Sequence, residues 1–313
     1  MTLPYAQVPR RAVVFAYHNV GVRCLRVLLA RGAELGLEVA LVVTHRDSPT
    51  ENIWFDSVAA VAAEFGIPTI TPDDPASPAV AQAVQAARPD FIFSFYYRHM
   101  LPTALLALAP LGAYNMHGSL LPKYRGRVPV NWAVLNGETE TGATLHEMAA
   151  KPDAGAILAQ TAVPILPDDT AGQVFEKVTV AAEQTLWGVL PDLLAGRAVR
   201  HPNKLAEGSY FGGRKPEDGR IDWTHSAAQV YNLIRAVAPP YPGAFTEVAG
   251  QRFVIADARP ARQALAPNLQ IGLQVSDNTL LGVCGDGRAI VIRSLLHDQR
   301  ELGVAEFASL IHP

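Results

Sequence analysis

The chain has 313 residues, about twice the length of a typical single domain, which favours one large domain and a smaller one. Hydrophobic residues make up 49% and charged residues 18%, and no run of about 18 apolar residues occurs, which excludes wholesale disorder and a membrane-spanning helix. The net charge of −3 offers no general attraction for nucleic acid. These properties are typical of a soluble globular protein.

Residues 1–11 contain no basic segment followed by an apolar stretch, so we expect no secretory signal peptide and a cytoplasmic protein. Cys24 and Cys284 lie far apart in the sequence, without a cluster of other metal-ligand residues beside them. They are therefore predicted to be reduced, mostly buried thiols, and neither a disulfide nor a zinc site is expected.

Up to about residue 196, short apolar runs typical of buried strands alternate with segments of helical spacing. Strands are expected at residues 13–17, 39–44, 91–94, 113–116, 143–148 and 156–163, and helices at 20–31, 54–65, 77–87, 130–135 and 171–194. This alternation predicts a Rossmann-like, mostly parallel sheet with helices on both faces. The turn at residues 17–21 lacks the three glycines of a dinucleotide fingerprint, so no nicotinamide or flavin cofactor is expected.

The pattern changes near residue 203, after which several glycines interrupt the chain. One helix is then expected at residues 227–237, and short strands at 253–255, 269–275, 280–284 and 289–294. They predict a small β-rich domain, either an OB-like barrel or an antiparallel sheet. We therefore divide the chain into an α/β domain, residues 1–203, and a C-terminal domain, residues 204–313.

Asn115 and His117 lie at the end of the strand expected over residues 113–116, two positions apart, so both side chains project from one face of the sheet. Ligands of open parallel sheets bind beyond the carboxyl ends of the strands, where this pair lies. The following loop carries Ser119, Tyr124 and the cations Lys123, Arg125 and Arg127, which predict an anionic ligand. Alternatively, His117 is a hydrogen-bonded core histidine and Asn115 caps a turn.

Asp153 lies between two expected strands, close to Gly155, which lets the backbone approach its surroundings closely. Its carboxylate could reach His117, where charge attraction would raise the pKa of the histidine and fix the orientation of the ring. The alternative is that Asp153 serves only its own turn, because Asp-Ala-Gly is good turn chemistry.

Asn, His and Asp without a nucleophilic cysteine or a Gly-x-Ser-x-Gly turn argue against a covalent acyl-enzyme. They suit direct acyl transfer, in which an amine attacks a bound carbonyl while Asn115 donates to the oxyanion and His117 handles the proton of the amine. One oxyanion donor is worth roughly 3 kcal/mol, and acid–base help roughly 10²–10⁴-fold. The chemistry requires no metal, and no histidines are paired at metal-ligand spacing.

Further candidates follow the strand expected at residues 91–94, where Tyr97 and His99 lie in a segment rich in ring-stacking and anion-binding groups. This segment is alternatively a purely structural aromatic loop. The remaining histidines are weaker candidates: His18, His45 and His146 follow or occupy strands, and His201, His225, His297 and His312 are peripheral.

Asn115-x-His117, the segment 119–126 and Asp153-x-Gly155, together with residues 222–223 and 241–244, resemble the folate-dependent formyltransferase family, whose members move a formyl group from 10-formyltetrahydrofolate to an amine. The resemblance implies that Asn115 stabilises the transition state and that His117 transfers the proton. It also implies that Asp153 raises the pKa of His117. The folate contacts implied are His99, Met100, Leu101, Arg127, Ala149, Ala150, Lys151, Pro152 and Asp153. Candidate substrate contacts are Tyr97, Ser119, Lys123 and Arg125.

Within this family, residues 15–18, 44–49, 94–100, 131–142 and 210–218 resemble the formyltransferase domain of a bifunctional enzyme that acts on UDP-4-amino-4-deoxy-L-arabinose in lipid A modification and polymyxin resistance. The decarboxylase domain of that enzyme has no counterpart in these 313 residues. We therefore expect a free-standing form, or one that acts on a related amino-sugar nucleotide.

Two alternatives remain: a methionyl-tRNA formyltransferase, and a catalytically silent module that binds folate or a nucleotide sugar. A tRNA-binding C-terminal domain should be basic. Residues 205–313 instead contain 10 Lys plus Arg and 11 Asp plus Glu, a net charge of −1. This balance favours a small nucleotide-sugar substrate, with no nucleic acid partner.

Overall fold

The computed structural model describes residues 9–49, 51–262 and 269–311. The chain forms two compact units, which are described separately. The first contains residues 1–126, 141–163 and 177–211, and the second contains residues 127–140, 164–176 and 212–313. The prediction that residues 1–11 form no signal peptide falls largely on residues 1–8, which lie outside the described residues.

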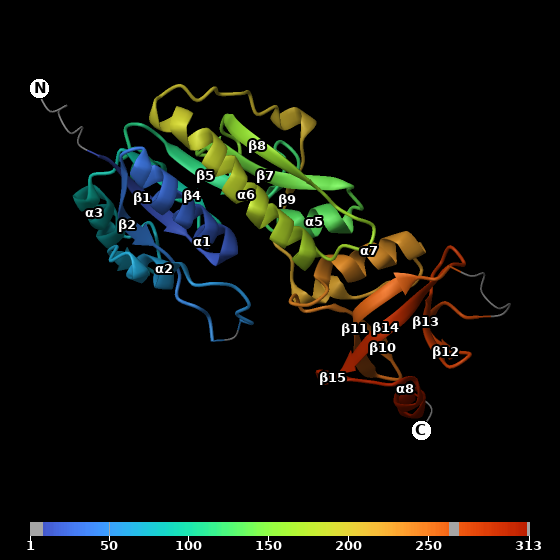
Figure 1. Cartoon of the computed structure of the whole chain (residues 1–313). Coiled ribbons are helices and arrows are strands. Elements are labelled where there is room, and N and C mark those ends of the chain that lie inside the picture. Colours follow the sequence, from blue (N-terminus) through green and yellow to red (C-terminus); the bar gives the residue numbers. More distant parts are fainter. Residues whose placement is uncertain (1–8, 50, 263–268, 312–313) are drawn as a thin grey trace, which may run out of the picture. The chain divides into compact units, whose positions relative to one another are not determined.

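The first unit contains a seven-stranded sheet in the order β3-β2-β1-β4-β5-β7-β8 (Figure 1). Its strands are β1 (Arg10–Ala16), β2 (Leu37–Val43), β3 (Thr69–Ile70), β4 (Phe91–Phe95), β5 (Ala113–His117), β7 (Glu140–Glu147) and β8 (Ile157–Pro164). Strands β1 to β5 pair in parallel, and β7 pairs antiparallel to β5. The predicted Rossmann-like, mostly parallel sheet is confirmed.

Helices cover both faces of this sheet. They are α1 (His18–Val27), which continues as the π-helical turn η1 (Leu28–Gly32), α2 (Val58–Glu64), α3 (Pro78–Ala87), α4 (Thr103–Leu106) and residues 177–194 of α6 (Ala171–Leu194). On one face, Val80 and Val84 of α3 share a buried cluster with Phe15 of β1 and Ile92 of β4. On the other face, Gly21 of α1 lies directly against Ala16, with little room for a side chain.

The helix expected at residues 54–65 begins only at Val58. The Ser57 hydroxyl accepts a hydrogen bond from the Ala60 N–H at 3.2 Å and so caps the first turn. Trp54 and Phe55 therefore lie ahead of the helix, although their spacing fits a helical face. The predicted start of the helix at Trp54 was wrong, because the Ser57 cap places the first helical residue at Val58.

The second unit combines helices with an antiparallel sheet in the order β10-β11-β14-β13-β12, with β15 paired to β14. Its elements are α5 (Pro129–Leu135), α7 (Ala227–Val237), α8 (Val304–Ile311), the 3-10 turn η3 (Pro216–Gly219), β10 (Ala244–Val248), β11 (Gln251–Pro260), β12 (Gly272–Ser276), β13 (Thr279–Val283), β14 (Ala289–His297) and β15 (Arg300–Glu301). Ser226 and Gln229 form a capping box at the start of α7. The predicted small β-rich C-terminal part is confirmed.

Three short elements complete the first unit, namely β6 (Arg125–Gly126), β9 (Tyr210–Phe211) and the 3-10 turn η2 (Leu205–Glu207). The two strands pair in parallel, so the segment after residue 208 holds the end of the loop that follows β5. Among the helices that the structure describes, none is long and apolar enough to cross a bilayer.

Candidate active site

Strand β5 places two predicted catalytic residues on one face of the sheet. Asn115 and His117 alternate with Met116, so their side chains project to the same side. The register of β7 sets His146 opposite Asn115, and Thr144 opposite His117. His117 is 6% exposed and Asn115 is partly buried, so the pair is largely shielded from water.

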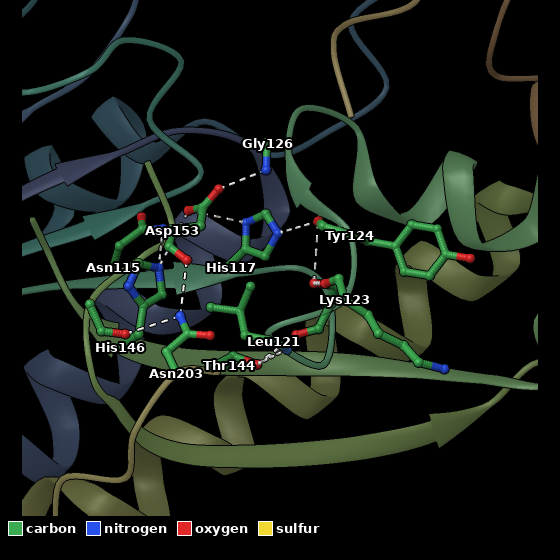
Figure 2. Close-up of polar contacts among 12 residues, drawn as sticks. Asn115, His117, Leu121, Lys123, Tyr124, Gly126, Thr144, His146, Asp153 and Asn203 are labelled. Atoms are coloured by element: carbon green, nitrogen blue, oxygen red, sulfur yellow. Dashed lines mark hydrogen bonds and ion pairs between the residues drawn. The ribbon is translucent and has the colours of Figure 1, made fainter. Parts of the chain in front are cut away.

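Asp153 reaches this pair from the loop between β7 and β8. Its Oδ1 lies 3.6 Å from His117 Nδ1, and its Oδ2 accepts a hydrogen bond from the Gly126 N–H at 2.8 Å (Figure 2). Asn203 Nδ2 donates to the carbonyl oxygens of Asp153 and Gly155 at 3.0 and 3.1 Å. The loop therefore holds the carboxylate against the histidine ring.

The Asp153 carboxyl is held in its charged form. Burial alone would raise its pKa, but charge attraction from His117, contacts with His146 and the hydrogen bond from Gly126 together keep the pKa well below its usual range. A carboxylate is therefore present at neutral pH. It can orient the His117 ring and stabilise a proton on it.

The second ring nitrogen of His117 also faces an oxygen. Nε2 lies 2.8 Å from the carbonyl oxygen of Tyr124, to which it donates when protonated. The two nitrogens thus point at a carboxylate and at a carbonyl. An N–H on either nitrogen of the ring would therefore have an oxygen to donate to. This arrangement suits a histidine that takes up a proton and passes it on.

His146 belongs to the same cluster, although its sequence position made it a weak candidate. Its Nδ1 lies 2.8 Å from the Glu147 carbonyl oxygen, and its Nε2 lies 3.1 Å from Asn115 Nδ2 and 3.4 Å from Asp153 Oδ1 (Figure 2). With the proton on Nδ1, Nε2 accepts from the amide of Asn115 and fixes the rotation of that amide, whereas with a proton on Nε2 the ring donates to Asp153 and lowers the pKa of that carboxyl. The usable signal was the pattern Thr144-x-His146, which repeats the two-residue spacing of the β5 pair.

The loop after β5 is tied from within. Ser119 is fully buried, and its hydroxyl donates to the Lys123 carbonyl oxygen at 2.7 Å. Thr144 Oγ1 donates to the Ser119 carbonyl oxygen at 2.6 Å. Ser119 thus closes the loop internally.

The three cations from which an anionic ligand was predicted differ in their exposure to solvent. Lys123 is exposed, whereas Arg125 is 7% exposed. Arg127 is exposed and belongs to the second unit. Their proposed ligand contacts stay predictions.

The segments predicted to hold folate flank β5. His99 and Met100 follow β4, one neighbour of β5, and both are exposed. Ala149, Ala150 and Lys151 are exposed, Pro152 is partly buried, and all four follow β7, the other neighbour. Leu101 is buried in an apolar cluster, and Met148, which precedes Ala149, packs against the same cluster. Between them runs the strand that carries Asn115 and His117.

Tyr97 is buried and stacks on His45, with ring centroids 4.1 Å apart. Burial, followed by the nearby positive charges, lowers the pKa of His45 to about 4 and that of His18 to about 3. Because these pKa values lie below the unfolded value, the unfolded chain binds protons first, and stability is expected to fall as the pH drops below about 6.5.

We expect NMR titration of the ring C–H resonances to give values near those pKa values for both histidines. The spectrum of a His45→Ala variant assigns the signal. A midpoint near 6.5 for either ring would contradict the burial of its charge-bearing atoms.

Gly155 has no room for a side chain, because a Cβ there would overlap the carbonyl oxygen of Glu147. Gly155→Ala is expected to destabilise the protein by roughly 1–3 kcal/mol, measured by urea unfolding, because the loop that carries Asp153 must move. The matched control is Gly188→Ala in α6, where no atom lies near the added methyl group. Helix propensity predicts a neutral or stabilising effect there, and equal losses at both sites would contradict the steric argument.

Among the described residues, no group of three or more His, Cys, Asp or Glu side chains is placed to hold a metal ion. A Rossmann-like sheet with a buried Asn–His–Asp cluster at a strand end defines an α/β enzyme suited to direct group transfer. Residues 11–190 match the family model described as "Formyl transferase", and residues 214–310 match "Formyl transferase, C-terminal domain". The chain therefore belongs to the formyl transferase family, and the predicted enzyme class is confirmed.

Several solved structures share the fold. The N-formyltransferase from Helicobacter canadensis, in complex with folinic acid and dTDP-3-aminofucose, is 19% identical with a TM-score of 0.70, over 91% of this chain and 99% of that one. A sugar N-formyltransferase from Shewanella is 20% identical with a TM-score of 0.64, over 79% and 96%. HypX from Aquifex aeolicus, in complex with tetrahydrofolic acid, is 19% identical with a TM-score of 0.61, over 96% of this chain and 47% of that one.

Proposed function

We propose that the protein transfers the formyl group of 10-formyltetrahydrofolate to the amine of a nucleotide-linked amino sugar. The observation that carries the proposal is the buried cluster in which Asp153 faces His117 beside Asn115. The amine attacks the formyl carbon, the Asn115 amide donates to the developing oxyanion, and His117 takes the proton that the amine loses. The bond from that carbon to the folate nitrogen then breaks, and tetrahydrofolate leaves with a proton on this nitrogen.

The proposed folate contacts are residues 99–101 and 149–153, which follow the two neighbours of β5, and Arg127. Similar proteins crystallised with folinic acid or tetrahydrofolic acid support a folate donor. For the acceptor we propose Tyr97, Ser119, Lys123 and Arg125 as candidate contacts. Of these four, Lys123 is exposed, whereas Tyr97, Ser119 and Arg125 are buried.

The specific acceptor that we propose is UDP-4-amino-4-deoxy-L-arabinose. The enzyme would then act in lipid A modification and polymyxin resistance. The sequence resemblance supports it, and the Helicobacter enzyme with its bound dTDP-3-aminofucose supports the wider class of nucleotide-linked amino sugars. The near-neutral charge of residues 205–313 disfavours methionyl-tRNA as the acceptor. A cytoplasmic location is part of the same proposal.

The test is to offer purified protein 10-formyltetrahydrofolate with three acceptors in parallel: UDP-4-amino-4-deoxy-L-arabinose, a dTDP-linked amino sugar and charged initiator tRNA. Formation of the formyl amide is followed by mass spectrometry. The highest kcat/KM is expected with the UDP sugar. A preference for tRNA would overturn the proposed acceptor, and no transfer to any of the three would favour a binding module instead.

A further inference from the structure

The loop between β7 and β8 that carries Asp153 is held by the side chain of Asn203. This residue lies 50 positions beyond Asp153, in the segment that follows α6. Its Nδ2 donates to the carbonyl oxygens of Asp153 and Gly155 at 3.0 and 3.1 Å (Figure 2). Both hydrogens of one amide group are therefore used on one loop, and we call these two bonds the amide clamp.

The clamped loop is bent tightly. Asp153 has a φ of 47°, in the left-handed region that residues with a side chain rarely adopt. A Cβ on Gly155 would overlap the carbonyl oxygen of Glu147, so the chain passes close to the end of β7 there. Such a conformation persists only where its surroundings hold it, and conformations of this kind cluster at functional sites. The amide clamp is one of the contacts that hold it.

The segment that carries Asn203 is itself anchored to the sheet. His201 and Ile157 exchange backbone hydrogen bonds at 2.8 and 2.9 Å, and Ile157 is the first residue of β8, the last strand of the sheet. The Leu205 N–H donates to the carbonyl oxygen of Asn203 at 2.9 Å. Asn203 therefore starts from a fixed backbone, and its side chain ties the position of the loop to the edge of the sheet.

The position of this loop decides three contacts of the Asp153 carboxylate. Its oxygens lie 3.6 Å from His117 Nδ1 and 3.4 Å from His146 Nε2, and they accept from the Gly126 N–H at 2.8 Å. Because the attraction between charges falls with distance, a shift of the Asp153 backbone weakens the hold of the carboxylate on the His117 ring. The amide clamp acts on the backbone of this same residue.

The chemistry of the clamp requires an amide. Asn203 Oδ1 is buried, and among the described residues it has no hydrogen-bond partner. A buried oxygen without a partner costs free energy, so the favourable contribution of this polar group lies in its two donor bonds. With the amide turned round, Oδ1 would face the two carbonyl oxygens and repel them. A carboxylate of the same shape would repel them as well.

We propose that Asn203 is a positioning residue for the reaction: its amide holds the loop so that the Asp153 carboxylate faces the His117 ring, and it acts on formyl transfer only through Asp153. The inference rests on the proposed function and adds a residue to it. Loss of the amide is therefore expected to slow the chemical step rather than to weaken binding of the acceptor.

Asn203→Ala is expected to lower kcat by roughly 10- to 100-fold with little change in KM for the acceptor, because misplacing a catalytic group by about 1 Å can cost about 10²-fold. Asn203→Asp keeps the shape of the side chain but places an oxygen where the donor was, so kcat should fall at least as far. The matched control is Asn136→Ala, which removes an exposed amide that donates to the Trp132 carbonyl oxygen at 2.9 Å and should leave kcat unchanged. Wild-type kcat in Asn203→Asp would overturn the proposal.

A double variant separates positioning from general support of the fold. If Asn203 acts only through Asp153, adding Asn203→Ala to Asp153→Asn should lower kcat by no more than about 2-fold, because the carboxylate that the clamp places is already gone. A merely structural part would not produce this dependence. If the two losses multiplied in the double variant, Asn203 would act independently of Asp153 and the proposal would be wrong.

Amide hydrogen exchange, measured without folate or acceptor, distinguishes this inference from the proposed function. We expect Asn203→Ala to speed exchange of the Gly126 N–H, which donates to Asp153, but not of the Arg125 N–H, which donates to the Ser209 carbonyl oxygen at 3.0 Å. If this result is obtained but no acceptor is formylated, the function is wrong and the positioning of Asp153 stands. If formylation proceeds while kcat and exchange at Gly126 match the wild type, the positioning is wrong and the function stands. Faster exchange at both amides would indicate general loosening and would also refute the positioning.

Discussion

Replacing His117 with alanine is expected to lower kcat for formyl transfer by roughly 10²–10⁴-fold, the range for loss of a general acid–base group. The ring lies 3.6 Å from the Asp153 carboxylate and 2.8 Å from the Tyr124 carbonyl oxygen, so it is positioned to accept a proton and to hold it. KM for both substrates should change little, because the lost interaction develops in the transition state. Initial-rate kinetics at saturating folate measure both constants.

The alanine variant also removes a buried ring, so a second variant is needed to separate chemistry from packing. His117→Gln can retain a donor to the Tyr124 carbonyl oxygen but cannot carry the proton. It should lose activity as severely as the alanine variant while unfolding closer to the wild-type temperature. His225→Ala, at an exposed position in the second unit, is the control. A glutamine variant with wild-type kcat would refute the proton-transfer role.

Local signals made much of the fold predictable. The long helix α6 has the ends that the sequence predicted, because Thr170 and Gln173 exchange capping hydrogen bonds before it and Gly196 follows it. Strand β5 was recognisable as an apolar run that ends in polar residues. Such features depend on neighbours within a few residues, which is the range over which periodicity and capping act.

The parts of the site that escaped prediction depend on contacts between distant segments. His146 joins Asn115 only because β7 pairs antiparallel with β5, and hydrophobic spacing does not specify the partner of a strand. The sequence places Arg125 in a cationic loop that predicts an anionic ligand, but the residue is buried where β6 pairs with β9, more than 80 residues along the chain. Trp54 fitted a helical pattern, and the Ser57 cap excluded it from the helix.

Asp153→Asn is expected to lower kcat by roughly 10²–10³-fold, because an amide cannot stabilise a proton on His117 as a carboxylate does. The variant keeps an oxygen that accepts from the Gly126 N–H, so the loop should retain its position. The loss should therefore appear in kcat and in its pH profile more than in KM for folate. An unchanged kcat would leave Asp153 with only its structural part in the loop.

The same substitution has a pH signature in stability. The folded pKa of Asp153 is depressed, so the charged carboxylate stabilises the fold above its unfolded pKa of about 3.9, and this contribution is lost as the pH falls through the lower folded pKa. The free energy of unfolding of the wild type should exceed that of Asp153→Asn near pH 5, and the gap should close in more acidic solution. Asp192→Asn, which breaks an exposed pair with Arg197, is the control and should show almost no gap at any pH. If the difference in free energy of unfolding between the wild type and Asp153→Asn widened towards acidic pH, the carboxyl group of Asp153 would be protonated in the folded protein. A charged Asp153 could then not orient His117.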